Sequence, residues 1–183
     1  MMGRQPTIET DKLILRPFAI SDAPEVQRLA GDEAIASTTI NIPHPYEDGA
    51  AEAWISKHAE RYASGDMCEF AITLRDNGAL IGAIMLAVEQ RHSRAELGYW
   101  IGVPYWGNGY CTEAARAMLE FGFNTLGLNR IHAVHFARNP ASGRVLQKIG
   151  LRREGCFRQH VLKWDRFEDL EVYGILRDDC RSG

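Results

Sequence analysis

The chain has 183 residues, of which 45% are hydrophobic and 25% charged, with a formal net charge of −3. These are values of a globular chain long enough to close its own core. The acidic balance argues against a nucleic-acid partner, which would need a basic stripe.

The four cysteines are scattered and show no metal-ligand spacing, so we expect no metal. Scattered cysteines without a disulfide framework fit a reducing compartment. No apolar run is long enough for a signal peptide or a membrane span. We therefore expect a cytoplasmic protein that contacts neither membrane nor nucleic acid.

The spacing of apolar residues predicts groups of strands and helices separated by glycine and proline. In chain order we expect a strand at 12–18, a helix from a cap at Ser21 or Asp22 to Gly31, a loop at 38–49, a helix at 50–64, strands at 68–74, 80–88 and 94–102, a helix at 112–126, a strand at 130–136, a helix at 139–150, and strands at 151–162 and 169–176. A three-strand meander thus precedes a β-α-β crossover. This order predicts an α+β fold with one mixed sheet in a single domain, residues 1–183.

The stretch WGNGYC lies between the strand at 94–102 and the helix at 112–126. A glycine turn that opens onto a helix start exposes successive N–H groups, which bind phosphate or pyrophosphate. The alternative is a tight strand-to-helix connection. A P-loop would need Lys and Ser or Thr after Gly109, where Tyr110 and Cys111 stand. A dinucleotide fingerprint would need a third glycine at Thr112, so neither nucleotide class is supported.

Four stretches carry a resemblance to a known family: AELGYWIGVPYWGNGYCTEA, LGLNRIHA, RNPASGRVLQKIGLRREG and WDRFEDLEVYGIL. They resemble the GNAT superfamily of N-acetyltransferases, and within it the RimJ/RimL-type branch. The resemblance extends from LILRPF to VYGIL. It implies the acyl-CoA N-acyltransferase fold, which is a mostly antiparallel sheet with helices on both faces. In that fold the strand at 94–102 diverges from its parallel neighbour, leaving a V-shaped gap for the cofactor.

The family's pyrophosphate motif, (Arg/Gln)-x-x-Gly-x-(Gly/Ala), falls on Trp106, Gly109 and Cys111. The first and last positions depart from the motif, but the backbone amides that hold the anion remain. The resemblance implies acetyl-CoA as co-substrate. The implied contacts are Ile101, Gly102 and Val103 along the pantetheine arm, Trp106, Gly107, Asn108, Gly109, Tyr110, Cys111 and Thr112 around the pyrophosphate, and Asn139 and Ser142 at the next helix start.

Acetyl transfer from a thioester to an amine needs a neutral amine, a stabilised oxyanion and a proton source for the departing thiolate. The catalytic candidates are Ser142 and Glu96. Ser142 matches the branch pattern N-x-x-S and would face the thiol, although it could simply cap the helix. Glu96 would be the general base, directly or through water; alternatively it is a carboxylate paired with an arginine such as Arg94. A backbone N–H near Ile101 would polarise the carbonyl.

Several other side chains are not assigned to catalysis or to cofactor binding. These are His132 and His135 as reserve bases, Trp54, Trp100, Tyr99, Tyr46 and His44 as core or acceptor-pocket residues, and Asp169 and Tyr173, which would shape the acceptor side. The expected function is acetyl transfer to a primary amine, either a protein N-terminus or a small molecule, by direct attack in a ternary complex. The alternative is a non-catalytic CoA-binding regulatory or interaction domain, which would not need Ser142. Whether the chain forms a homodimer stays open.

Overall fold

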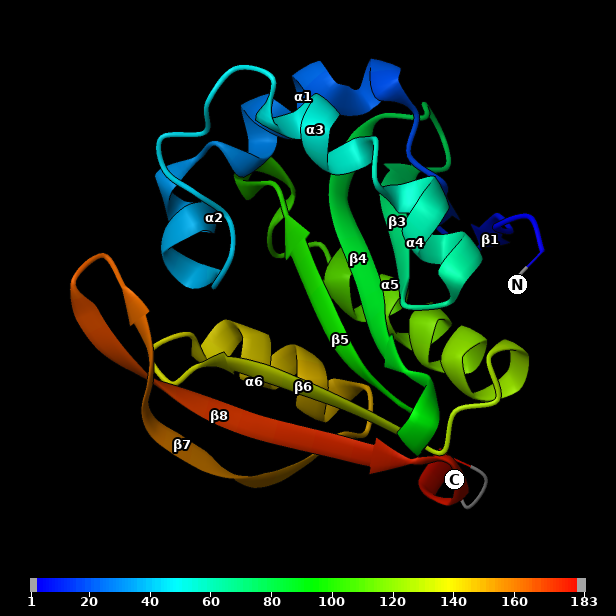
Figure 1. Ribbon diagram of the computed structural model, residues 1–183, viewed down its shortest axis with the longest axis vertical. Coiled ribbons are helices and arrows are strands. Elements are labelled where there is room, and N and C mark those ends of the chain that lie inside the picture. The colour runs from blue at the N-terminus through cyan, green and yellow to red at the C-terminus, as the bar shows by residue number, and fades with distance from the viewer. Residues whose placement is uncertain (1–2, 181–183) are drawn as a thin grey trace.

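A computed structural model describes residues 3–180, which form helices around one eight-stranded sheet (Figure 1). The strands are β1 (Ile8–Glu9), β2 (Leu13–Arg16), β3 (Met67–Leu74), β4 (Leu80–Glu89), β5 (Arg94–Ile101), β6 (Arg130–Phe136), β7 (Arg152–Lys163) and β8 (Arg166–Leu176). Their order across the sheet is β1-β2-β3-β4-β5-β6-β8-β7. Among the strand pairs of the described residues, only β5–β6 is parallel. The predicted mixed, mostly antiparallel sheet is confirmed.

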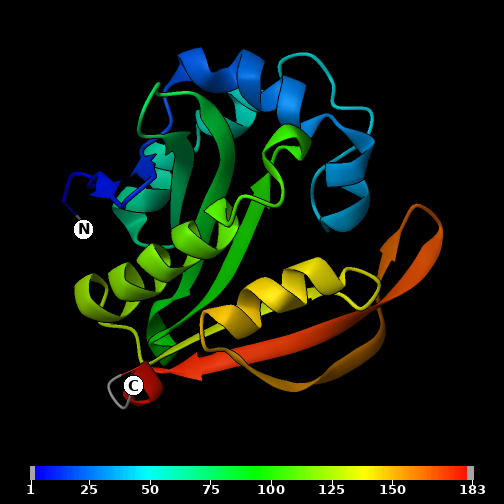
Figure 2. The same ribbon diagram turned by 180° about the vertical axis from the view of Figure 1, so that it is seen from behind.

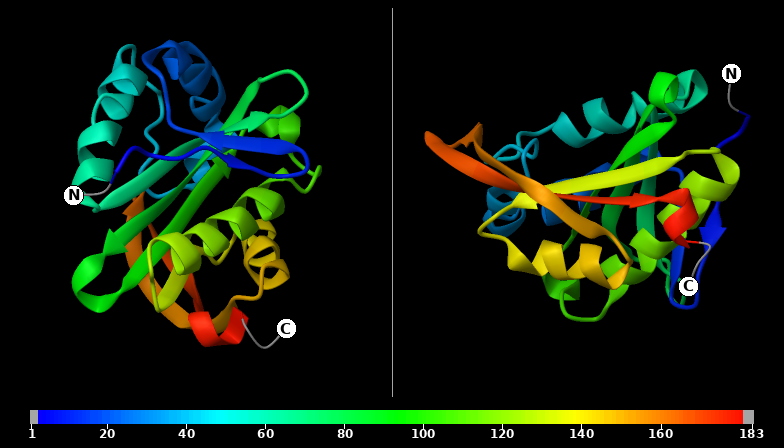
Figure 3. Two further views of the ribbon diagram at one scale, coloured as in Figure 1. Left: turned by 90° about the vertical axis from the view of Figure 1, so that its right-hand side faces the viewer. Right: turned by 90° about the horizontal axis from the view of Figure 1, so that it is seen from below.

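Helices cover both faces of the sheet, as predicted (Figures 1 and 2). They are α1 (Ala23–Ala30), α2 (Glu33–Thr38), α3 (Ala50–Ile55), α4 (His58–Ser64), α5 (Tyr110–Glu120), α6 (Pro140–Lys148) and α7 (Arg177–Cys180), with short 3-10 or π turns at Ile20–Asp22, Gln90–His92, Val103–Tyr105 and Phe121–Thr125. Helices α5 and α6 lie on one face, and α3 and α4 lie on the other. The hairpin of β7 and β8 extends past the rest of the sheet (Figure 3).

The alternation of side chains along the strands divides the core between the two faces. On one face, Phe70 of β3 and Ile84 of β4 pack toward Met118 of α5, and all three side chains are fully buried. On the other face, Ala71 of β3 packs with Val26 of α1 in a smaller cluster. The sheet is therefore anchored from both sides, which fixes the directions of β4 and β5.

The structure differs from the sequence-based prediction at two helices in the first third of the chain. Helix α2 was not predicted; Asp32 caps it by accepting a hydrogen bond from the amide of Ala34 at 2.9 Å. The helix predicted at 50–64 is interrupted after Ile55. There Ser56 turns its hydroxyl back onto the carbonyl of Ala53 at 2.9 Å, a local bond that competes with regular helix geometry.

Smaller differences concern one short strand and the ends of two other elements. Strand β1 was not predicted, since two residues are too few to show a period. Helix α5 begins at Tyr110, two residues earlier than expected, and gives way at Phe121 to a π turn. Strand β8 begins at Arg166, three residues earlier than expected, because the hairpin turn is confined to Trp164 and Asp165, both at positive φ.

The β5–β6 pair is hydrogen bonded over only part of its length. Paired residues are Arg94 with Arg130, Ala95 with Ile131, and Glu96 with His132, and beyond them the two strands diverge (Figure 1). Each strand keeps its other neighbour, since β5 remains paired to β4 and β6 to β8. The sheet therefore splits between residues 97–101 and 133–136, as the GNAT resemblance implied.

Candidate active site

Backbone groups of β5 line one side of the split. The Gly102 amide donates to the carbonyl of Ile81 at 2.8 Å, so these two residues form a hydrogen-bonded pair. Antiparallel strands alternate such pairs with non-bonded ones, so the main-chain groups of Ile101 and Tyr99 point away from β4 and toward the split. The Trp106 indole donates to the Ile101 carbonyl at 2.6 Å. The Ile101 amide remains available at the position expected of the carbonyl polariser.

The glycine loop follows directly. Gly107 and Gly109 have φ of +79° and +81°, a left-handed conformation that side-chain-bearing residues rarely adopt. A Cβ on either glycine would meet nothing within 4 Å, so this side of the loop is open. The Asn108 side chain donates to the carbonyls of Tyr105 and Trp106, both at 3.1 Å, and closes the turn.

The amides from Gly107 to Thr112 donate no hydrogen bond to any group in residues 3–180. Gly109 is the N-cap residue of α5, so the last three of these amides form the start of that helix. Unpaired amides and the positive end of the helix dipole together favour an anion. The loop therefore fits the diphosphate expected there.

Helix α6 brings a hydroxyl to the split. Its N-cap Asn139 accepts a hydrogen bond from the Ser142 amide at 3.4 Å, so Asn139 caps the helix. The Ser142 hydroxyl is not a cap; its Oγ lies 2.8 Å from the Tyr99 Oη. The structure thus joins α6 to β5 through two hydroxyls.

Tyr99, which the sequence analysis gave no catalytic role, lies beside Ser142. Burial raises the pKa of its phenol well above the usual value; the neighbouring Cys111 thiol adds to this effect, and the hydrogen bond with Ser142 opposes it. Burial also raises the pKa of Cys111, to about 12, so neither group ionises near neutral pH. The signal that could have identified Tyr99 is the alternation of β5, which places it on the same face as Ile101.

Glu96 lies at the closed end of the split on the opposite face of β5 from Tyr99. Its carboxylate is 3.8 Å from the Nε2 of His132, and the side chain is 44% exposed. Burial lowers the pKa of His132, against an opposing effect of Glu96. The alternative pairing with Arg94 is not formed, because Arg94 binds Glu89 at 2.6 Å. The structure does not bring Glu96 into contact with Ser142.

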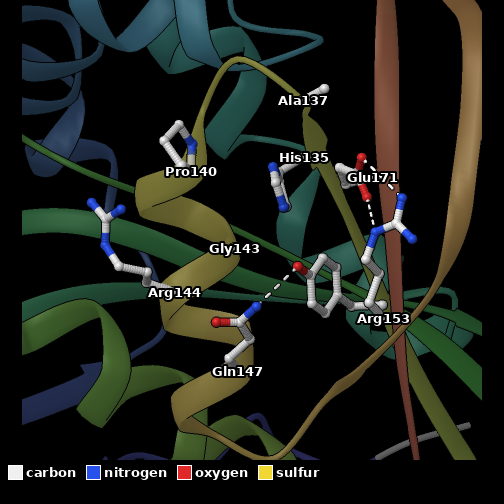
Figure 4. Close-up of a pocket in the computed structure, with 9 residues that line it drawn as sticks. His135, Ala137, Pro140, Gly143, Arg144, Gln147, Arg153 and Glu171 are labelled. Atoms are coloured by element: carbon white, nitrogen blue, oxygen red, sulfur yellow. Dashed lines mark hydrogen bonds and ion pairs between the residues drawn. The ribbon is translucent and has the colours of Figure 1, made fainter.

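Helix α6 forms a pocket of about 280 Å³ with β6, β7 and β8 (Figure 4). Gln147 donates to the Tyr173 hydroxyl at 3.3 Å across it, so Tyr173 supports the helix. The His135 Nδ1 bonds the Phe136 carbonyl at 2.8 Å. A Cβ at Gly143 would lie 2.8 Å from His135 Nε2, so glycine there lets α6 approach β6 closely.

The β7–β8 hairpin is tied to the loop after α2. Lys163 donates to the carbonyls of Ile40 and Ile42 at 3.3 and 2.8 Å, and Asp169 accepts from the Gln159 amide at 2.7 Å. The hairpin also carries exposed apolar side chains: Phe157, Leu162, Trp164 and Phe167.

Other aromatic candidates are divided between core and surface. Trp54, Trp100 and Tyr46 pack beside the smaller core cluster, while the His44 ring lies 6.1 Å from that of Trp164. Among residues 3–180 no three His, Cys, Asp or Glu side chains gather as a metal site would require. No helix in this part of the chain is long and apolar enough to cross a membrane.

Comparison with known proteins decides the family. Residues 12–152 match the acetyltransferase (GNAT) domain. The chain belongs to the GNAT acetyltransferase family. It is 36% identical over 174 residues to the uncharacterised N-acetyltransferase YoaA of Bacillus subtilis, covering 94% of this chain and 97% of that protein.

Ribosomal-protein acetyltransferases are among the relatives of this GNAT chain. The Escherichia coli ribosomal-protein-serine acetyltransferase is 29% identical over 100 residues, 54% of this chain and 56% of that one. The structure of RimL, a ribosomal L7/L12 α-N-protein acetyltransferase in complex with coenzyme A, superposes with a TM-score of 0.87, covering 95% of this chain and 99% of that one. At 17% identity, RimL shows the shared fold alone. The predicted GNAT fold, the RimJ/RimL-type resemblance and an acyltransferase enzyme are confirmed.

Proposed function

We propose that this GNAT enzyme transfers an acetyl group from acetyl-CoA to a primary amine, with residues 1–183 acting as one acetyltransferase domain. The observation that carries the proposal is the placement of the open glycine loop directly after the strand that borders the split. An anion held at the loop would direct its attached chain along the end of β5, where the Ile101 and Val103 amides donate to no group in the described residues.

The chain's own residues would hold the co-substrate at three places. Main-chain groups of Ile101, Gly102 and Val103 would bind the pantetheine arm. Of these, the Gly102 amide and carbonyl and the Ile101 and Val103 carbonyls already have protein partners, so the Ile101 and Val103 amides would make the contacts. The turn from Trp106, through Gly107, Asn108, Gly109, Tyr110 and Cys111, to Thr112 would bind the diphosphate through amides. The start of α6 would contribute Asn139 and Ser142.

Bound acetyl-CoA would supply an acetyl thioester. The Ile101 amide would stabilise the oxyanion that forms when the amine attacks, since a fixed N–H inside a split sheet needs no reorganisation. Ser142 would donate a hydrogen bond to the departing sulfur. Direct attack needs no protein nucleophile.

Glu96 is the proposed base for the amine proton. Because it lies on the other face of β5 from Ser142, an amine that Glu96 serves would approach from that face, directly or through water. A water molecule or the substrate itself is the alternative base.

The proposed acceptor is a protein N-terminal α-amine, with a small primary amine as the alternative. Support comes from the relative named for ribosomal-protein-serine acetylation and from the exposed apolar side chains of the β7–β8 hairpin. The same exposed apolar surface could instead pack against a second copy of the chain in a homodimer.

The test is to incubate the protein with acetyl-CoA and a panel of N-terminal peptides, polyamines and amino sugars, and to follow free thiol. We expect thiol release that depends on an amine, together with an equal amount of acetylated product. Coenzyme A binding without release for any amine would favour the non-catalytic alternative.

A further inference from the structure

Tyr99 and Ser142 form the closest side-chain contact recorded between β5 and α6. The Tyr99 Oη lies 2.8 Å from the Ser142 Oγ and 3.3 Å from the Ser142 carbonyl oxygen. Tyr99 stands in the part of β5 that has left β6, so this contact spans the split. Any group reaching Ser142 from the split meets a hydroxyl that already has a partner.

The two hydroxyls have two protons and two possible arrangements. In one, Tyr99 donates to the Ser142 Oγ, and the serine proton is free to point elsewhere. In the other, Ser142 donates to the Tyr99 Oη, and the tyrosine proton turns to the Ser142 carbonyl. Only the first arrangement leaves Ser142 able to donate to a sulfur atom.

Geometry and acidity favour the first arrangement. Both arrangements use the 2.8 Å contact between the two hydroxyls. The second also depends on the bond from the Tyr99 hydroxyl to the Ser142 carbonyl, which at 3.3 Å is longer than O–H···O bonds usually are. A phenol is also a stronger acid than an aliphatic alcohol and therefore the better donor. Because burial raises its pKa, Tyr99 keeps its proton throughout the neutral range.

We propose that Tyr99 is a positioning residue, which donates to the Ser142 Oγ and thereby directs the serine proton into the split toward the departing sulfur. The assignment rests on the proposed acetyl transfer. Hydrogen bonds in a chain polarise one another, so the serine is also a stronger donor than it would be alone. Neither hydroxyl gives up its proton; the thiolate receives one from the amine or from solvent.

The first test replaces Tyr99 by Phe, which keeps the ring and removes the hydroxyl. Tyr62→Phe is the matched control, because Tyr62 is a buried tyrosine of α4 whose hydroxyl has no recorded hydrogen bond. For Tyr99→Phe we expect kcat about tenfold lower and KM for acetyl-CoA within about twofold, since one hydrogen bond is worth roughly that factor. The control should match the wild type.

Three further measurements separate positioning from packing. The double variant Tyr99→Phe/Ser142→Ala should be no slower than Ser142→Ala alone, because Tyr99 acts through Ser142. Fluorotyrosines placed at position 99 are stronger acids and should raise kcat if the phenol donates. The pKa of the thiol of bound coenzyme A, followed by thiolate absorbance, should rise in Tyr99→Phe by about one unit, matching a tenfold loss.

Each contrary result has a distinct meaning. If the wild type and the Tyr99→Phe variant are equally active, the role of Tyr99 is overturned but the acetyl transfer stands. The same conclusion follows if the double variant is tenfold slower than Ser142→Ala. Fluorotyrosines that lower kcat would show that Tyr99 accepts, which also overturns it. A wild type without turnover overturns the proposed function, and the thiol pKa in the coenzyme A complex then decides the hydrogen-bond direction.

Discussion

Replacing Gly109 by Asp places a carboxylate at the turn where the six amides of residues 107–112 donate to no group between residues 3 and 180. A Cβ at Gly109 would meet nothing within 4 Å, so its addition does not overpack the loop. The left-handed backbone, with φ of +81°, costs a side-chain-bearing residue about 1 kcal/mol, although Asp and Asn tolerate it better than most residues. The remaining effect is charge.

The magnitude follows from Coulomb's law. A carboxylate about 5 Å from one diphosphate charge, at an effective dielectric of about 20, is repelled by about 3 kcal/mol. Such a penalty weakens coenzyme A binding on the order of a hundredfold. Gly109→Asn is the matched control, because it has the same shape and the same backbone cost without the charge.

Titration calorimetry of coenzyme A against both variants measures the difference, and pantetheine, which lacks the diphosphate, is the ligand control. We expect Gly109→Asp to bind coenzyme A on the order of a hundredfold more weakly than Gly109→Asn, a gap that narrows at high salt. Pantetheine should not distinguish the variants. Equal coenzyme A affinities for the Asp and Asn variants would refute the diphosphate site.

Three other predictions concern catalysis and stability. Ser142→Ala should lower kcat on the order of a hundredfold while calorimetric affinity for coenzyme A changes little, and unchanged turnover would remove it from the mechanism. Glu96→Gln should move the pH–rate profile to higher pH, because only amine already neutral in solution then reacts; a profile with the same midpoint would leave deprotonation to water or substrate. Burial raises the pKa of Asp22, but its hydrogen bonds with Arg16 and the Ala19 amide outweigh burial and lower it. Asp22→Asn should therefore cost about 2 kcal/mol of unfolding free energy in urea at pH 7, and the cost should disappear as pH falls through the lowered folded pKa; a cost independent of pH would contradict this.

The strands other than β1 could be predicted because their alternation is long enough to show a period. Helix α2 could not, since its six residues end in Ser37 and Thr38, whose hydroxyls bond back to the Ala34 carbonyl. Such residues are neutral or unfavourable inside helices, so propensity gave no signal there. The Asp32 cap was the only local indication.

Part of the candidate site could be predicted from the sequence, and part could not. The glycine loop is local, so its residues and their order before α5 could be recognised from a short stretch of sequence. The contact of Tyr99 with Ser142 depends on how far β5 and β6 diverge and how closely α6 approaches, which no local pattern encodes. The contact of Glu96 with His132 likewise depends on how β5 and β6 pair, and these parallel strands are paired over only three residues.

A crystal structure of the protein with coenzyme A would show whether the glycine loop holds the diphosphate. We expect a diphosphate within hydrogen-bond distance of the amides between Gly107 and Thr112, and a pantetheine arm that enters between β5 and β6 with its sulfur beside the Ser142 hydroxyl. A diphosphate bound elsewhere, with those amides still unpaired, would contradict this expectation.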